Sequence, residues 1–112
     1  MKDKIKFEFD ENEKGIIINS LNLLRNYLHS QERSVDFIDE LLLKISDKHK
    51  VELDTFDSKI IINALNNLRY KLKSQNLSRS DVNDLILKMI DETDKKKVLI
   101  RIPKRDNGNR RY

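Results

Sequence analysis

The side chains best able to catalyse a reaction in this chain are two histidines, His29 and His49. A general base must lie within hydrogen-bond reach of the proton that it removes, and the sequence places no target beside either ring. His29 falls at the end of a predicted helix, where a cation suits the helix dipole. Because no nucleophile–base arrangement is recognisable, we expect a protein that is not an enzyme and has no catalytic residues.

The acidic residues and the glycines form no recognisable metal or cofactor site. Asp36, Asp39 and Glu40 cluster, but their spacing differs from that of a calcium loop. The chain has no cysteine, which excludes disulfides and thiolate metal sites. Its two glycines, Gly15 and Gly108, form no phosphate-binding loop. We therefore expect neither a bound metal nor a cofactor.

The helices and strands that must position these side chains belong to a sequence repeat that occurs twice in the chain. Residues 7–47 align on residues 51–91 without a gap, at an offset of 44, and 18 of the 41 aligned positions are identical. A match of this quality at a fixed period indicates two copies of one supersecondary unit. A pseudo-twofold axis between the two units is the natural arrangement, because isologous pairing is the commonest dimer symmetry.

Each unit is predicted to be a strand followed by two helices. Residues Ile5–Phe9 and His49–Leu53 alternate apolar and charged side chains, as is typical of a half-buried strand. Apolar residues at spacings of three and four then indicate helices with one core-facing side, and the short breaks between them indicate antiparallel hairpins. The four helices are predicted at residues 11–29, 35–46, 55–73 and 79–91.

Apolar residues alternate again just before Pro103, which predicts a third strand over residues 97–102. The predicted fold class is therefore α+β and mainly helical. It consists of two tandem β-α-α repeats and a C-terminal strand, with one small sheet and two helical hairpins. Residues 1–103 would form a single domain, and residues 104–112 a flexible basic tail.

Charge is distributed unevenly along the chain. Residues 1–91 contain 15 Lys/Arg and 16 Asp/Glu, whereas residues 92–112 contain 8 Lys/Arg and 3 Asp/Glu. The body is therefore nearly neutral, and the C-terminal segment is basic. Such a charge distribution indicates which partners a protein can bind, but it does not indicate its fold. No apolar run approaches the roughly 20 residues that span a bilayer. The N-terminus also lacks the apolar segment of a signal peptide, so we expect no membrane association and a cytoplasmic location.

Three polar residues recur beside the apolar stripe of the long helices. Asn19, Asn22 and Arg25 return as Asn63, Asn66 and Arg69. One interpretation is a duplicated ligand site. The other, which we favour, is a polar seam where each helix meets the opposite unit, with both arginines paired to acids.

Differences between the units indicate a contact surface. The first unit is apolar, and the second polar, at four positions that should gather at the tip of the first hairpin. These positions are Leu23, Tyr27, Val35 and Phe37, whose counterparts are Asn67, Lys71, Arg79 and Asp81. If the four are exposed, they form a partner-binding patch. If they are buried, they pack beneath the tail or the third strand.

The basic C-terminal segment is an alternative site, for nucleic acid. Its candidate residues are Lys95, Lys96, Lys97, Arg101, Lys104, Arg105, Arg110 and Arg111. Contact with phosphates would make binding steeply dependent on salt. However, Tyr112 is the only aromatic residue there, which is too little for a base-stacking platform. A solvated terminus and an acidic protein partner are the other interpretations of this segment.

The unit also has a recognisable pattern. A strand leads into Glu8-Phe9-Asp10, then the run IIINSLNLLR at residues 16–25, then a short helix ending in LLLK at residues 41–44. This pattern resembles small uncharacterised proteins of Gram-positive bacteria, their phages and mobile elements, which look like single or tandem copies of such a unit. The resemblance implies no particular activity.

Taken together, these features predict a non-enzymatic interaction protein, encoded by a phage or mobile element. It would bind a host protein, and inhibit or regulate it, by covering part of its surface. We expect a monomer with pseudo-twofold symmetry or a weak homodimer. The alternative is a small nucleic-acid-binding accessory factor that acts through the basic C-terminal segment.

Overall fold

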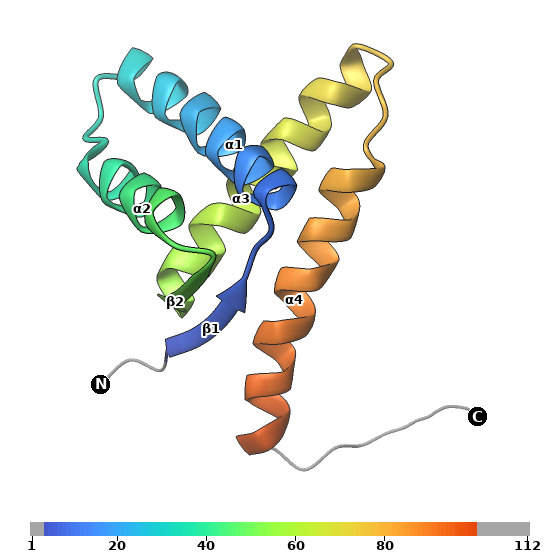
Figure 1. Cartoon of the computed structure of the whole chain (residues 1–112). Coiled ribbons are helices and arrows are strands. Elements are labelled where there is room, and N and C mark those ends of the chain that lie inside the picture. Colours follow the sequence, from blue (N-terminus) through green and yellow to red (C-terminus); the bar gives the residue numbers. More distant parts are fainter. Residues whose placement is uncertain (1–3, 101–112) are drawn as a thin grey trace.

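A computed structural model describes residues 4–100 of the chain, with side chains up to Thr93, and contains six elements (Figure 1). In chain order they are β1 (Lys4–Glu8), α1 (Glu11–Ser30), α2 (Asp36–Asp47), β2 (Lys50–Asp54), α3 (Thr55–Ser74) and α4 (Ser80–Ile100). The predicted mainly helical α+β class is confirmed, with α1–α2 and α3–α4 as helical hairpins. No helix within the described residues is long and apolar enough to cross a membrane.

The two strands form an antiparallel sheet in which Phe7 lies opposite Val51. The alternation in the sequence decides which face is buried, because successive strand side chains point to opposite sides of the sheet. Ile5 and Phe7 of β1, with Val51 and Leu53 of β2, are turned into the core. The lysines and glutamates between them face solvent.

Local capping signals set where the long helices begin. The Asp10 side chain accepts a hydrogen bond from the Glu13 backbone N–H at 2.8 Å, and the Glu13 carboxylate accepts one from the Asp10 N–H at 3.0 Å. This reciprocal capping box satisfies donors that the first helical turn leaves unpaired. Asp54 caps α3 through one such bond, since its side chain accepts from the Asp57 N–H at 2.8 Å.

Both long helices end in a left-handed residue. Glu32 has a φ of 57° and Asn76 a φ of 59°. The backbone N–H groups that follow turn back on the helix, since Arg33 donates to the Leu28 carbonyl and Leu77 donates to the Leu72 carbonyl. This geometry is typical of helix C-termini and is usually occupied by glycine or asparagine.

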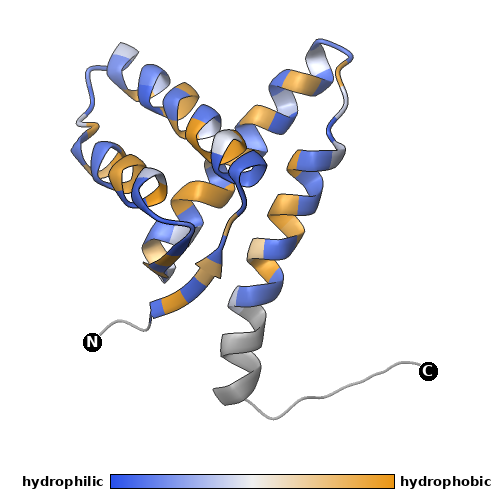
Figure 2. Cartoon of the chain, in the orientation of Figure 1, coloured by the Kyte–Doolittle hydropathy of each residue, from blue (hydrophilic) through white to orange (hydrophobic). Residues whose placement is uncertain are grey.

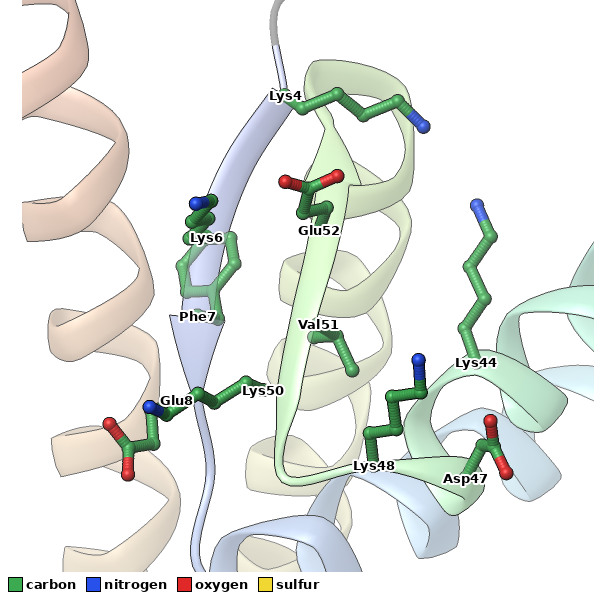
Figure 3. A pocket seen from close by; sticks show the side chains of 10 residues that line it. All are labelled: Lys4, Lys6, Phe7, Glu8, Lys44, Asp47, Lys48, Lys50, Val51 and Glu52. Atoms are coloured by element: carbon green, nitrogen blue, oxygen red, sulfur yellow. The ribbon is translucent and has the colours of Figure 1, made fainter.

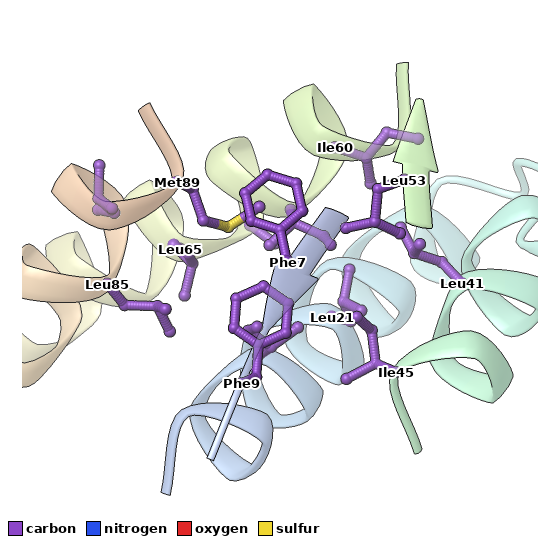
Figure 4. Close-up of a cluster of buried hydrophobic side chains, with 14 of the residues drawn as sticks. Phe7, Phe9, Leu21, Leu41, Ile45, Leu53, Ile60, Leu65, Leu85 and Met89 are labelled. Atoms are coloured by element: carbon purple, nitrogen blue, oxygen red, sulfur yellow. The ribbon is translucent and has the colours of Figure 1, made fainter. Parts of the chain in front are cut away.

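The core lies between the sheet and the apolar sides of the helices, and Figure 2 shows how apolar and polar residues alternate along these elements. The rings of Phe7 and Phe9 stack there with their centroids 5.5 Å apart (Figure 4). Helices α1 and α3 pack against each other. Each contributes a small, fully buried side chain to the core, Ser20 and Ala64 respectively.

The predicted third strand is wrong where the structure describes it. Helix α4 continues to Ile100, so residues 97–100 are helical. Residues 101 and 102 and the predicted tail, 104–112, lie outside the described residues. A short apolar run does not by itself distinguish strand from helix. An established helix gains one backbone hydrogen bond for each residue added, and no glycine or proline interrupts the sequence between Ser80 and Pro103.

Candidate protein-interaction site

An exposed pair of phenylalanines lies where α2 meets α3. Phe37 is in the first turn of α2 and Phe56 in the first turn of α3. Their ring centroids are 6.4 Å apart, and the side chains are 37% and 57% exposed. Beside them, Lys44 Nζ of α2 binds Asp57 Oδ2 of α3 at 3.0 Å. Both rings therefore stand on helical backbone, and the ion pair joins the two helices that carry them.

Two of the residues predicted to bind a partner, Leu23 and Tyr27, lie apart from the phenylalanine pair. Leu23 and Tyr27 of α1 line a shallow groove with Asn67 and Lys71 of α3. Asn67 is the residue equivalent to Leu23 in the second half of the sequence, and Lys71 is the residue equivalent to Tyr27. Tyr27 is 61% exposed, whereas Leu23 is half-buried. This groove and the phenylalanine pair therefore divide the predicted patch between two neighbourhoods.

The remaining predicted residue, Val35, is half-buried just before α2. Its carbonyl accepts hydrogen bonds from the N–H groups of Ile38 and Asp39, both at 3.0 Å. Its described role is thus to begin the helix that carries Phe37. The sequence reasoning missed Phe56, although a large aromatic residue stands there at a position where the first half has Asn12.

The recurring arginines pair within their own hairpins. Arg25 Nε lies 2.7 Å from Asp39 Oδ1, and an Arg69 guanidinium nitrogen donates to Asn83 Oδ1 at 3.3 Å. The Asp39 carboxylate raises the pKa of Arg25, first through the hydrogen bond and then through its charge. The predicted acid partner is confirmed for Arg25 but wrong for Arg69, which binds an amide. Both arginine contacts lie within a hairpin and not between the two units.

Two lysines connect the first half of the chain to the second. Lys44 of α2 binds Asp57 of α3, and Lys88 of α4 binds Glu13 of α1, with Nζ 2.9 Å from Oε1. Lys88 follows Lys44 by 44 residues, as Asp57 follows Glu13. The two contacts are therefore reciprocal, which is the pattern that an isologous arrangement produces.

Among the described residues, Lys88 makes two further contacts that Lys44 does not. Its Nζ donates to the backbone carbonyl of Glu8 at 2.6 Å and lies 5.3 Å from the centre of the Phe9 ring. A cation over an aromatic face is attracted by the ring quadrupole. Lys88 thus joins α4 to both the end of β1 and the beginning of α1.

The two histidines lie in different surroundings. His49 Nδ1 lies 3.0 Å from the Phe9 carbonyl oxygen, and its Nε2 lies 3.2 Å from Glu11 Oε2. Both neighbours are hydrogen-bond acceptors. His29 is exposed in the last turn of α1, where it was predicted. Within the described part of the chain, no group of three His, Cys, Asp or Glu side chains is arranged to hold a metal.

A hollow of about 720 Å³ lies over the solvent-facing side of the strands and the end of α2 (Figure 3). Its charged lining is mixed. The lining lysines are Lys4, Lys6, Lys44, Lys48 and Lys50, and the lining acids are Glu8, Asp47 and Glu52. A phosphate backbone favours an excess of cations over a broad surface, so this mixture does not extend the predicted nucleic-acid site onto the sheet.

The residues of the predicted nucleic-acid site fall mostly beyond the described structure. Lys95, Lys96 and Lys97 belong to the last part of α4, where only the backbone is described. The remaining candidates, Arg101, Lys104, Arg105, Arg110 and Arg111, lie outside the described residues.

Comparison of the chain with protein-family models, with curated proteins and with solved structures found no match. The function must therefore be argued from the geometry of this chain.

Proposed function

We propose that this chain is a non-enzymatic protein-binding factor, encoded by a phage or mobile element. Its role is to bind a host protein and to inhibit or regulate it by covering part of its surface. The observation that carries this proposal is the exposed aromatic pair, Phe37 and Phe56. It presents apolar surface on two helices that are tied together by the ion pair beside it.

Aromatic side chains are favoured at such sites because they bury a large apolar area while losing few rotamers. Phe56 alone leaves more than half of its surface in water. Fully burying a phenylalanine is worth about 1.5–3 kcal/mol. Since the helices that carry the two rings are already formed, little ordering cost would accompany binding.

We further propose that the chain arose by duplication of one strand–helix–helix unit. The reciprocal lysine contacts and the placement of Phe7 opposite its own counterpart, Val51, support this history. The surface equivalent to the aromatic pair would carry Asp81 and Asn12 in place of the phenylalanines. Only one of the two related surfaces is then aromatic, so we expect one partner molecule for each chain.

A matched pair of substitutions in α3 tests the proposal. Phe56→Asn and Tyr70→Asn each replace an exposed aromatic residue, 57% and 71% exposed, with the asparagine found at the equivalent position of the first half. Tagged wild-type protein and both variants would be used to capture proteins from a lysate of the native host. The captured protein would then be purified and its affinity measured by calorimetry.

We expect Phe56→Asn to weaken binding by about 2 kcal/mol, or about thirty-fold in Kd, which is typical of a central aromatic contact. Tyr70→Asn should bind like the wild type. Circular dichroism would establish that both variants are folded. Equal binding by all three proteins would refute the role of the aromatic pair, and the absence of any saturable partner would refute the proposed function.

A further inference from the structure

Within the described part of the chain, the outer edge of β2 presents backbone groups that its neighbours leave unpaired. The Phe9 N–H donates to the His49 carbonyl at 2.9 Å, in the same register as the strand pairs. Hydrogen-bonded and non-hydrogen-bonded pairs alternate along an antiparallel ladder. Val51 and Leu53 therefore bond to β1, whereas the N–H and C=O groups of Lys50 and Glu52 point away from it.

The corresponding edge of β1 is covered. Helix α4 packs beside β1, and Lys88 Nζ donates to the outward-pointing carbonyl of Glu8. In the first half of the chain, Lys44 binds Asp57 and makes no contact with Glu52 among the described residues. Helix α2 ends at Asp47, where the chain turns back into β2, and its last turn lines the hollow over the strands instead of packing along β2 (Figure 3).

An open strand edge is a template for another strand, and the charges along β2 identify which strand fits. Two lysines, Lys48 and Lys50, precede Val51, and two acids, Glu52 and Asp54, follow it. An antiparallel copy of this segment, centred on Val51, would place Lys50 of each copy opposite Glu52 of the other. Cross-strand pairs of opposite charge stabilise a sheet, and like charges destabilise it.

The molecule already contains this pairing once. Strand β1 has the same order of charges around Phe7, and it lies against β2 with Lys6 opposite Glu52 and Glu8 opposite Lys50. Its own outer edge is closed by α4. The outer edge of β2 is the one at which the pairing can be repeated.

We propose that two copies of this chain associate through β2, antiparallel and centred on Val51. Lys50 of each copy exchanges both backbone hydrogen bonds with Glu52 of the other, and their side chains form ion pairs on the solvent-facing side. The result is a continuous sheet in the order β1-β2-β2-β1, with α4 closing each end. This inference does not rest on the proposed function, because it uses none of the aromatic surface.

Two opposite charge changes test this pairing. Lys50→Glu places acids opposite acids in the dimer, and Glu52→Lys places lysines opposite lysines, so neither variant should self-associate. An equimolar mixture restores opposite charges at both pairs and should associate as a heterodimer. Sedimentation equilibrium of the full chain from about 10 µM to about 1 mM covers the range of weak association.

Glu8→Lys is the matched control, because Glu8 is the counterpart of Glu52 on the covered strand. This variant should self-associate like the wild type. A monomeric wild type over the whole concentration range would overturn the proposal. A mixture that fails to associate, although circular dichroism shows both variants folded, would also overturn it, as would equal loss of association in Glu8→Lys.

A cross-link provides a second measurement that does not depend on charge. Side chains at a non-hydrogen-bonded antiparallel pair have Cβ atoms about 4.5–5.5 Å apart, which is close to disulfide geometry. The chain contains no cysteine, so Val51→Cys can react only with a second copy. We expect a disulfide-linked dimer under mild oxidation, and a variant that stays monomeric when folded and oxidised would contradict the register.

Discussion

Replacing Lys88 should destabilise the protein more than replacing its counterpart, Lys44. Lys88→Met keeps the length of the side chain but removes the charge. It would break the contact with Glu13, the hydrogen bond to the Glu8 carbonyl and the approach to the Phe9 ring. Lys44→Met would break only the ion pair with Asp57.

The partial exposure of these groups limits the expected magnitudes. The Lys88 and Glu13 side chains are 34% and 22% exposed, so solvent screens their ion pair to about 0.2–1 kcal/mol. The carbonyl hydrogen bond is worth about 0.5–1.5 kcal/mol and the contact with the ring about 0.5–1 kcal/mol. We therefore expect Lys88→Met to cost about 1.2–3.5 kcal/mol, and Lys44→Met about 0.2–1 kcal/mol.

Urea unfolding followed by far-ultraviolet circular dichroism would measure both losses, with the slope of the transition checked for constancy. Lys88→Arg is a useful control, because it retains the charge while changing the shape of the donor. A loss for Lys88→Met no larger than that for Lys44→Met would refute the reasoning. It would mean that the contacts with Glu8 and Phe9 do not stabilise the fold.

Three further results are expected. Glu32→Asn copies Asn76 at the equivalent left-handed position. It should raise the free energy of unfolding by up to about 1 kcal/mol, because asparagine tolerates this conformation better than glutamate does. A lower urea midpoint for the variant would contradict this. Leu68→Ala should cost about 2–5 kcal/mol of stability, because Leu68 is buried. Leu24→Ala should cost less, because Leu24 is only partly buried. Equal losses of stability in urea melts would contradict this difference. Deleting residues 104–112 should leave the circular-dichroism spectrum unchanged, and it should weaken DNA binding and its salt dependence if the basic segment contacts phosphates. The nucleic-acid alternative fails if the intact protein has no measurable affinity for DNA or RNA at low salt.

Local signals made the long helices predictable from the sequence. Their expected ranges, 11–29 and 55–73, agree to within one residue with α1 and α3. The reason is that an acidic cap, a 3.6-residue apolar period and a terminal break all act over a few neighbouring residues. The alternation that defines the two strands is equally local, and so is the division of each strand into a buried and a solvent-facing side.

The same local reasoning failed where a neighbouring element decides the outcome. The apolar run after residue 97 fits a strand or a helix equally well, and the continuation of α4 makes it helical as far as Ile100. Arg69 was expected to meet an acid, but its partner depends on which residue of the second helix lies beside it. That residue is Asn83.

Some features of the candidate sites were predictable from the sequence, and others depend on the tertiary structure. Sequence comparison of the two halves identified Tyr27 and Phe37, which are both exposed. Their separate neighbourhoods follow only from the tertiary structure, which places Tyr27 of α1 beside α3 and brings the Phe37 ring of α2 to the Phe56 ring of α3. The self-complementary order of charges around Val51 can be recognised from the sequence alone. Which strand edge stays open is decided by the tertiary structure, because α4 covers β1 while α2 ends too early to cover β2.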